Sequence, residues 1–193
     1  MKNKLIIFIL TLGVFSIINT EMGIIGILPL ISTHYGITIT DAGLLVSLFA
    51  LVVAFAGPTM PLLFSRMNRK KAMITVLGMF TICNIIAAFA PNFMVALVAR
   101  VLPAFFHPIY VSLALTVAGS SVKEKEAPKA VSKVLMGVSA GMVLGVPIVS
   151  FIANSTSLKA GMLFFAIVNA IALVTTFLFI PTQSVSELSL IHI

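Results

Sequence analysis

The sequence predicts an all-α membrane protein with six transmembrane helices, and three observations support this prediction. Sixty per cent of the 193 residues are apolar and nine per cent are charged, which is more apolar surface than a soluble domain of this length can bury. The apolar residues form runs of about 20 or more, long enough to cross the hydrocarbon layer of a bilayer. Alternation with a period of two residues is missing, so a membrane β-barrel is not expected.

The six runs belong to one domain, placed at 1–187. They cover about 5–31, 43–64, 72–91, 93–119, 132–153 and 160–180. Asp41, just before Ala42-Gly43, is the expected N-cap of the second span. Pro103 and Pro108 should distort the fourth span, because proline removes a backbone donor and bends a helix.

The basic residues predict the orientation of the spans. With the N-terminus in the cytoplasm, ten of the twelve basic residues lie on the cytoplasmic side, Lys159 lies outside and Arg100 lies within a span. Because Lys and Arg resist translocation, this bias predicts a multi-pass membrane protein with a cytoplasmic N-terminus. The ten are Lys2, Lys4, Arg66, Arg69, Lys70, Lys71, Lys123, Lys125, Lys129 and Lys133.

Several classes of function are not expected. The net charge of +7 does not indicate nucleic-acid binding, because the charges lie in short turns between apolar runs and not on one face. The sequence has no cluster with metal-ligand spacing, no nucleophile with a base at hand and no glycine-rich phosphate loop. We therefore expect no enzyme, no metal and no cofactor.

Ionisable residues inside the spans are the candidates for function. A carboxylate such as Glu21 costs about 2.5–3.5 kcal/mol at the centre of a membrane helix, so it is a functional candidate by default. Counting residues at about 1.5 Å each places Glu21 and Arg100 at a similar depth, about 10–15 Å below the outer surface. They are therefore possible partners, and a structural ion pair between two helices is the simpler alternative. His107, on nearly the same face as Arg100, is either a hydrogen-bonded histidine at a helix contact or a contact to substrate in a cavity.

Small residues in the fifth span predict a close helix contact. Gly137, Gly141 and Gly145 are spaced by four, so they share one face on which another helix can approach closely. Pro147 follows two residues after the last of them and is grouped with this packing motif.

These motifs resemble those of a transporter family. The turn Pro61 to Lys71 resembles the pattern G-x-L-x-D-R-x-G-R-[RK] between helices 2 and 3 of the major facilitator superfamily, with Leu63, Arg66, Arg69 and Lys70 on matching positions. Pro61 replaces the first Gly, Ser65 the Asp and Asn68 the second Gly, which puts the usual gating network of this loop in doubt.

Further matches point to the drug:proton antiporters of that superfamily, in particular the bacterial purine, sugar and drug efflux type. Thr20-Glu21 with Gly26-Ile27-Leu28-Pro29 resembles their first helix. Arg100 resembles the arginine of their fourth-helix motif R-x-x-x-G, with Ala104 at the Gly. Gly141, Gly145 and Pro147 resemble their helix-5 motif G-x-x-x-G-P-x-x-G-G, with the proline displaced by one residue and the trailing glycines absent.

The resemblance implies the N-terminal half of a twelve-helix transporter, built from two inverted three-helix repeats. Its expected partners are the lipid bilayer, protons, a small-molecule substrate and a missing C-terminal six-helix half. The expected function is proton-coupled efflux of small molecules by alternating access. Glu21 would carry the proton, Arg100 would tune it, His107 would face the substrate cavity, and Arg66, Arg69 and Lys70 would form a gating loop. The alternative is a six-helix membrane protein that acts as a homodimer or as a non-transporting assembly subunit.

The last six residues carry a separate expectation. Leu188-Ser189-Leu190-Ile191-His192-Ile193 equals the translation of a mosaic-end adapter used in transposase-made sequencing libraries, CTG TCT CTT ATA CAC ATC. We therefore expect 188–193 to be a non-native tail and the natural chain to continue.

Overall fold

The computed structural model describes residues 2–181 of the chain, and those residues are helical apart from short connections. Six helical stretches are long and apolar enough to cross a membrane within this part of the chain, as the sequence predicts. They are Asn3–Tyr35, Ile39–Leu63, Arg69–Ala88, Phe93–Ser120, Glu124–Ser155 and Leu158–Phe179. The expected tail at 188–193 lies outside the described residues.

Polar side chains fix where the spans begin. Helix α3 (Ile39–Leu63) has Thr38 as its N-cap, and Thr38 Oγ1 accepts from the Asp41 backbone N–H at 3.1 Å while Asp41 Oδ2 accepts from the Thr38 N–H at 3.3 Å. Asp41 is therefore the third residue of the helix and not its N-cap, because the helix starts earlier and forms a reciprocal capping box. Three other helices have an N-cap whose side chain accepts one bond from a backbone N–H. Asn68 caps α4 (Arg69–Ala88), Asn92 caps α5 (Phe93–Val101) and Ser157 caps α8 (Leu158–Phe179).

Two of the spans are interrupted by 3₁₀ segments. The first consists of α1 (Lys2–Gly23), η1 (Ile24–Ile27) and α2 (Leu28–Tyr35), and the fourth of α5, η2 (Leu102–Phe106) and α6 (His107–Ser120). Pro103 and Pro108 stand in the first turns of η2 and α6, so the fourth span is distorted where the prolines predict it. The interruption of the first span is a finding that the sequence did not predict.

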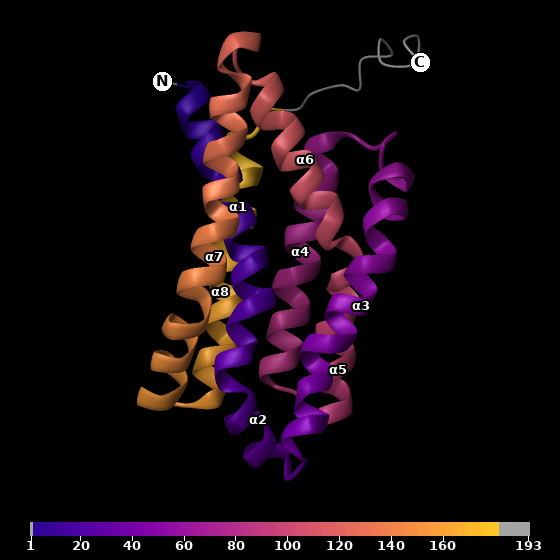
Figure 1. The fold of residues 1–193 in the computed structure, drawn as a ribbon, viewed down its shortest axis with the longest axis vertical. Helices are drawn as coiled ribbons and strands as arrows, with labels where there is room; N and C mark the ends of the chain where they lie inside the picture. Colours follow the sequence, from indigo (N-terminus) through magenta and orange to yellow (C-terminus); the bar gives the residue numbers. More distant parts are fainter. Residues whose placement is uncertain (1, 182–193) are drawn as a thin grey trace.

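The spans pair in a regular way (Figure 1). The first packs on the fifth, which consists of η3 (Glu124–Glu126) and α7 (Ala127–Ser155), the fourth packs on the second, and the third packs on the sixth. Two three-helix units related by inversion produce this pairing, in which each interrupted span meets the middle helix of the other unit.

The buried side chains form two apolar clusters, one toward each end of the bundle. The first is built around residues such as Leu10, Phe80 and Tyr110, and the second around Ile27 and Phe165. In the first span, the first cluster ends at Ile18 and the second begins at Ile24, and the buried polar residues Asn19 and Thr20 lie between them. The candidate site is in this polar layer.

Candidate functional site

Glu21 and His107 meet where the two interrupted spans face each other. Glu21 lies in the last turn of α1, just before η1, and His107 is the first residue of α6, just after η2. His107 Nε2 is 3.1 Å from Glu21 Oε2, at ion-pair distance but without the alignment of a hydrogen bond. The Glu21 side chain is 17% exposed and that of His107 is 10% exposed, so a proton or a small polar group can reach the pair.

Arg100 reaches the same place from α5 but binds backbone instead of the carboxylate. Its Nη2 donates to the Glu21 carbonyl at 2.8 Å, its Nε donates to the Leu45 carbonyl of α3 at 3.3 Å, and its guanidinium lies 5.0 Å from the centroid of the Phe49 ring. The Glu21 carbonyl lies in the last turn of α1, where carbonyls lack the usual helical donors. Arg100 therefore joins α1 to α3 at the point where α1 changes to a 3₁₀ segment.

Glu21 and Arg100 lie at the same level of the bundle, since Arg100 reaches the Glu21 carbonyl, but the possible carboxylate–guanidinium pair between them is not formed in the described part of the chain. Counting residues gives the depth of a side chain but not its direction around the helix. The direction of His107 relative to Arg100 depends on η2, which lies between them, because a 3₁₀ segment has three residues per turn and a longer rise than an α-helix. As a result His107, the first residue after η2, faces the carboxylate.

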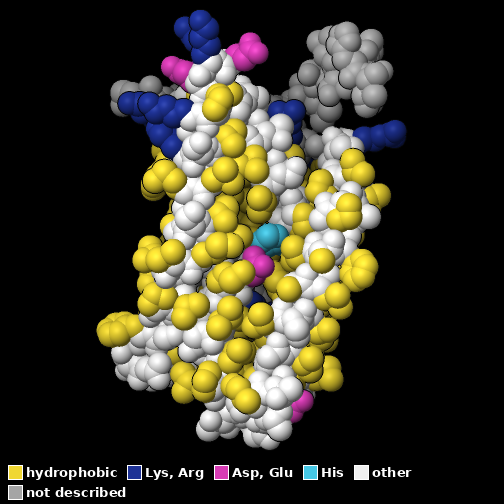
Figure 2. Space-filling view, viewed as in Figure 1, with side chains coloured by type: hydrophobic (Ala, Val, Ile, Leu, Met, Phe, Trp, Pro, Cys, Tyr) yellow, Lys and Arg dark blue, Asp and Glu magenta, His cyan; other side chains and the backbone are white. Residues whose placement is uncertain are grey.

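An open groove runs alongside His107. It has a volume of about 620 Å³ between α3 and α6, and its wall includes Pro58, His107 and Ser112 among apolar side chains. Figure 2 shows acidic and histidine side chains near the middle of a face that is otherwise mostly apolar. A solute in this groove would meet apolar walls and a few polar groups, as is usual in small-molecule sites.

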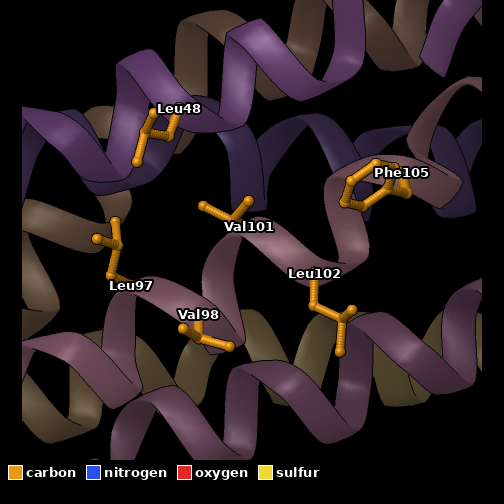
Figure 3. A pocket seen from close by; sticks show the side chains of 6 residues that line it. All are labelled: Leu48, Leu97, Val98, Val101, Leu102 and Phe105. Atoms are coloured by element: carbon orange, nitrogen blue, oxygen red, sulfur yellow. The ribbon is translucent and has the colours of Figure 1, made fainter. Parts of the chain in front are cut away.

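A second hollow carries no group for chemistry (Figure 3). This pocket of about 290 Å³ lies between α3 and the α5–η2 segment, and only apolar side chains line it, among them Leu48, Val101 and Phe105. Apolar pockets on a lipid-facing bundle are expected to hold acyl chains, so we do not place the functional site here.

A hydrogen-bonded network that the sequence did not predict holds α1 next to the site. Asn169 Nδ2 of α8 donates to Thr20 Oγ1 at 2.8 Å, Ser16 Oγ donates to Asn169 Oδ1 at 3.2 Å, and Asn84 Nδ2 of α4 donates to Thr20 Oγ1 at 3.4 Å. The one feature of the sequence that could have indicated these residues is an amide or hydroxyl side chain within an apolar span. Asn19 is also buried, and within residues 2–181 neither of its amide atoms has a hydrogen-bond partner.

The glycines of the fifth span lie against α1. A Cβ atom added to Gly137, Gly141 or Gly145 would come within 2.5 Å of the Thr11 carbonyl oxygen, 2.8 Å of Ile18 Cβ and 3.1 Å of Asn19 Oδ1, respectively. Pro147 does not share this face and is exposed, because two residues turn an α-helix by about 200°.

The predicted gating loop spans the end of α3 and the start of α4. Arg66 is exposed in the loop, while Arg69 and Lys70 lie in the first turn of α4, where positive charge opposes the helix dipole. Lys70 Nζ is 5.6 Å from the ring centroid of Phe177 on α8, so the loop contacts the sixth span. Groups of three or more metal-ligating side chains are not found in residues 2–181.

Comparison with known families decides the identity. The sequence profile of the Major Facilitator Superfamily matches residues 10–189. The chain belongs to the major facilitator superfamily. As a member of this superfamily of transport proteins it is not an enzyme, in agreement with the sequence prediction.

Relatives in the superfamily include bacterial proteins of similar sequence. The chain is 34% identical over 174 residues to the "Uncharacterized MFS-type transporter YtbD" of Bacillus subtilis, covering 90% of this chain and 44% of that protein. It is 30% identical over 181 residues to the "Inner membrane transport protein YdhP" of Escherichia coli, covering 94% of this chain and 46% of that protein. The chain thus spans about half the length of the curated relatives it matches.

Solved structures share the fold. A crystal structure of the peptide transporter POT in complex with sulfate superposes with a TM-score of 0.79 at 17% identity, covering 89% of this chain and 37% of that one. The crystal structure of the human organic anion transporter MFSD10 superposes with a TM-score of 0.74 at 16% identity, covering 93% of this chain and 48% of that one. At this identity the likeness establishes the major facilitator fold alone.

Proposed function

We propose that this chain is the N-terminal half of a proton-coupled secondary transporter of the drug:proton antiporter type, which exports small molecules by alternating access. The observation that carries the proposal is the Glu21–His107 contact of 3.1 Å at the junction of two interrupted spans. Broken helices in corresponding positions of two repeats mark substrate and ion sites in secondary transporters. Efflux is supported by the 26% identity over 142 residues to a Helicobacter pylori protein named "Probable sugar efflux transporter".

In this proposal Glu21 takes and releases the coupling proton, and His107 is its counter-ion. An ionised carboxylate inside a membrane helix needs a partner, so the charged pair holds α1 and α6 together at this level. Protonation of Glu21 removes the attraction and frees His107 toward the groove. Arg100 is a positioning residue, because it holds the Glu21 backbone in both protonation states.

The proposal places the chain in the bacterial plasma membrane with its N-terminus in the cytoplasm, paired with a second six-helix half. The N-terminus, the α3–α4 loop and the α6–α7 connection lie at one end of the bundle (Figure 1), and these segments carry most of the basic residues. This end would face the cytoplasm. Arg66, Arg69 and Lys70 would gate the cavity there, and Lys70 would do so through its contact with α8.

The test is Glu21→Gln in the full-length protein, reconstituted in proteoliposomes with a pH gradient and internal pyranine as the proton reporter. A panel of sugars, nucleosides and cationic dyes supplies the transported solute. The glutamine amide has the shape of the protonated acid but cannot release a proton by ionising, so we expect proton flux coupled to solute to be lost while solute binding persists.

Asp41→Asn is the matched control, since it makes the same acid-to-amide change in an exposed capping box at the end of a span. We expect it to transport normally. Glu21→Gln transport at the parental rate with the parental pH dependence would disprove the coupling role and leave Glu21 as a structural ion pair.

A further inference from the structure

A basic pocket lies at the end of the bundle where α1 begins and where α6 connects to α7. Its volume is about 520 Å³. Four lysines from three elements surround it and apolar side chains form part of its wall: Lys4 of α1, Lys125 of η3, Lys129 and Lys133 of α7, with Ile7 and Ala130. Figure 2 shows Lys and Arg side chains gathered at this end of the molecule.

The positive charge of this pocket is only partly neutralised by the described residues that line it. Four lysines and one carboxylate, Glu126, line it, which leaves a net charge of +3. Within residues 2–181 no ion pair joins any of the four lysines to a carboxylate, although Glu126 lies on the same wall. Lys129 and Lys133 are four residues apart on one helix face, where like charges repel. An anion bound between them would remove this repulsion.

The pocket lies at one end of the first and fifth spans, where charged and buried apolar side chains meet. Lys4 falls inside the first apolar span and Lys133 inside the fifth, while Ile7 and Ala130 belong to the buried apolar cluster. At the end of a membrane span, lysine side chains typically lay their stems on apolar surface and place their ammonium groups at the level of the lipid headgroups. A site with this layering suits a ligand with an anionic head and apolar chains.

We propose that this pocket binds the phosphate group of an anionic phospholipid, with Lys129 and Lys133 as its main contacts. Ammonium groups bind phosphate as point charges, and basic pockets between helices on the cytoplasmic side suit anionic headgroups. The bound lipid would join the start of α1 to the start of α7. These are the same two helices that meet along Gly137 and Gly141, so the lipid would hold the helix that carries Glu21.

The experiment uses the intact protein in detergent with equal amounts of phosphatidylglycerol and phosphatidylcholine, and native mass spectrometry counts the bound lipids. The test variant is the double substitution Lys129→Gln with Lys133→Gln. The control is Lys71→Gln with Lys123→Gln, which removes the same charge from the same end at residues that do not line the pocket. A parallel arm adds millimolar inorganic phosphate to the protein with the lipid already bound.

We expect preferential retention of phosphatidylglycerol, about tenfold weaker in the test variant and unchanged in the control. Failure of inorganic phosphate to displace the lipid supports a lipid headgroup as the source of the phosphate. Displacement of the lipid by inorganic phosphate at these concentrations would overturn the lipid assignment in favour of a free phosphate. Equal losses in both double variants, or no preference over phosphatidylcholine, would overturn the site itself.

Discussion

Alanine substitutions along the α1–α7 contact give a graded test of the packing. An added Cβ would lie 2.5 Å from a backbone oxygen at Gly137, 2.8 Å from a branched carbon at Gly141 and 3.1 Å from a side-chain amide oxygen at Gly145. Backbone and Cβ atoms cannot move without shifting a helix, whereas an amide group can rotate. We therefore expect destabilisation in the order Gly137→Ala, Gly141→Ala, Gly145→Ala.

The magnitude follows from two opposing effects. Replacing glycine by alanine inside a helix gains about 0.8–1 kcal/mol of helix propensity, and overpacking a tight contact costs about 1–3 kcal/mol. Gly78→Ala isolates the first effect, because Gly78 is inside α4 and an added Cβ there meets no atom of residues 2–181 within 4 Å, apart from its chain neighbours and the nearby backbone of its own helix. Gly137→Ala and Gly141→Ala should therefore be about 1–3 kcal/mol less stable than Gly78→Ala.

The chain supplies its own reporter for this measurement. Cys83 is the only cysteine in the sequence and is 3% exposed. A maleimide dye that fluoresces on reaction with a thiol will report its exposure during thermal unfolding in detergent. If Gly137→Ala and Gly141→Ala unfold at the temperature of Gly78→Ala, the close approach of α1 and α7 is wrong.

Three further predictions test the site and the topology. Arg100→Lys should lower the unfolding temperature in the same dye assay. Arg100 reaches the two carbonyls from two separate nitrogens, Nε and Nη2, whereas lysine has a single nitrogen, and a lost hydrogen bond from a charged donor costs about 1.5–3 kcal/mol; an unchanged temperature would contradict the role of Arg100 in joining α1 to α3. Asn169→Leu should cost about 1–2 kcal/mol by removing hydrogen bonds between spans, and unchanged stability would show that the network is dispensable. In a background with Cys83→Ala, a membrane-impermeant maleimide added outside whole cells should label Thr40→Cys and not Ser65→Cys, and the reverse pattern would invert the orientation.

The residues that the sequence placed well are those whose role depends on local pattern. Span positions follow from runs of apolar residues, because the bilayer imposes a minimum length on each helix. The spacing of Gly137, Gly141 and Gly145 alone put them on one face, and Pro103 with Pro108 located the interruption of the fourth span. The polar cap of α3 was anticipated only approximately, since Asp41 was the expected N-cap, whereas the helix begins earlier and has Thr38 as its N-cap.

Tertiary structure decided how the ionisable groups meet. Sequence indicated that Glu21, Arg100 and His107 were unusual, because charged and titratable groups are costly inside a membrane. It could not indicate that His107 faces the carboxylate while Arg100 binds the Glu21 carbonyl, since those directions depend on the 3₁₀ segments and on the crossing of α1 with α6. Counting residues along a helix fixes depth, whereas partner choice depends on rotation about the helix axis, which only the packed bundle sets.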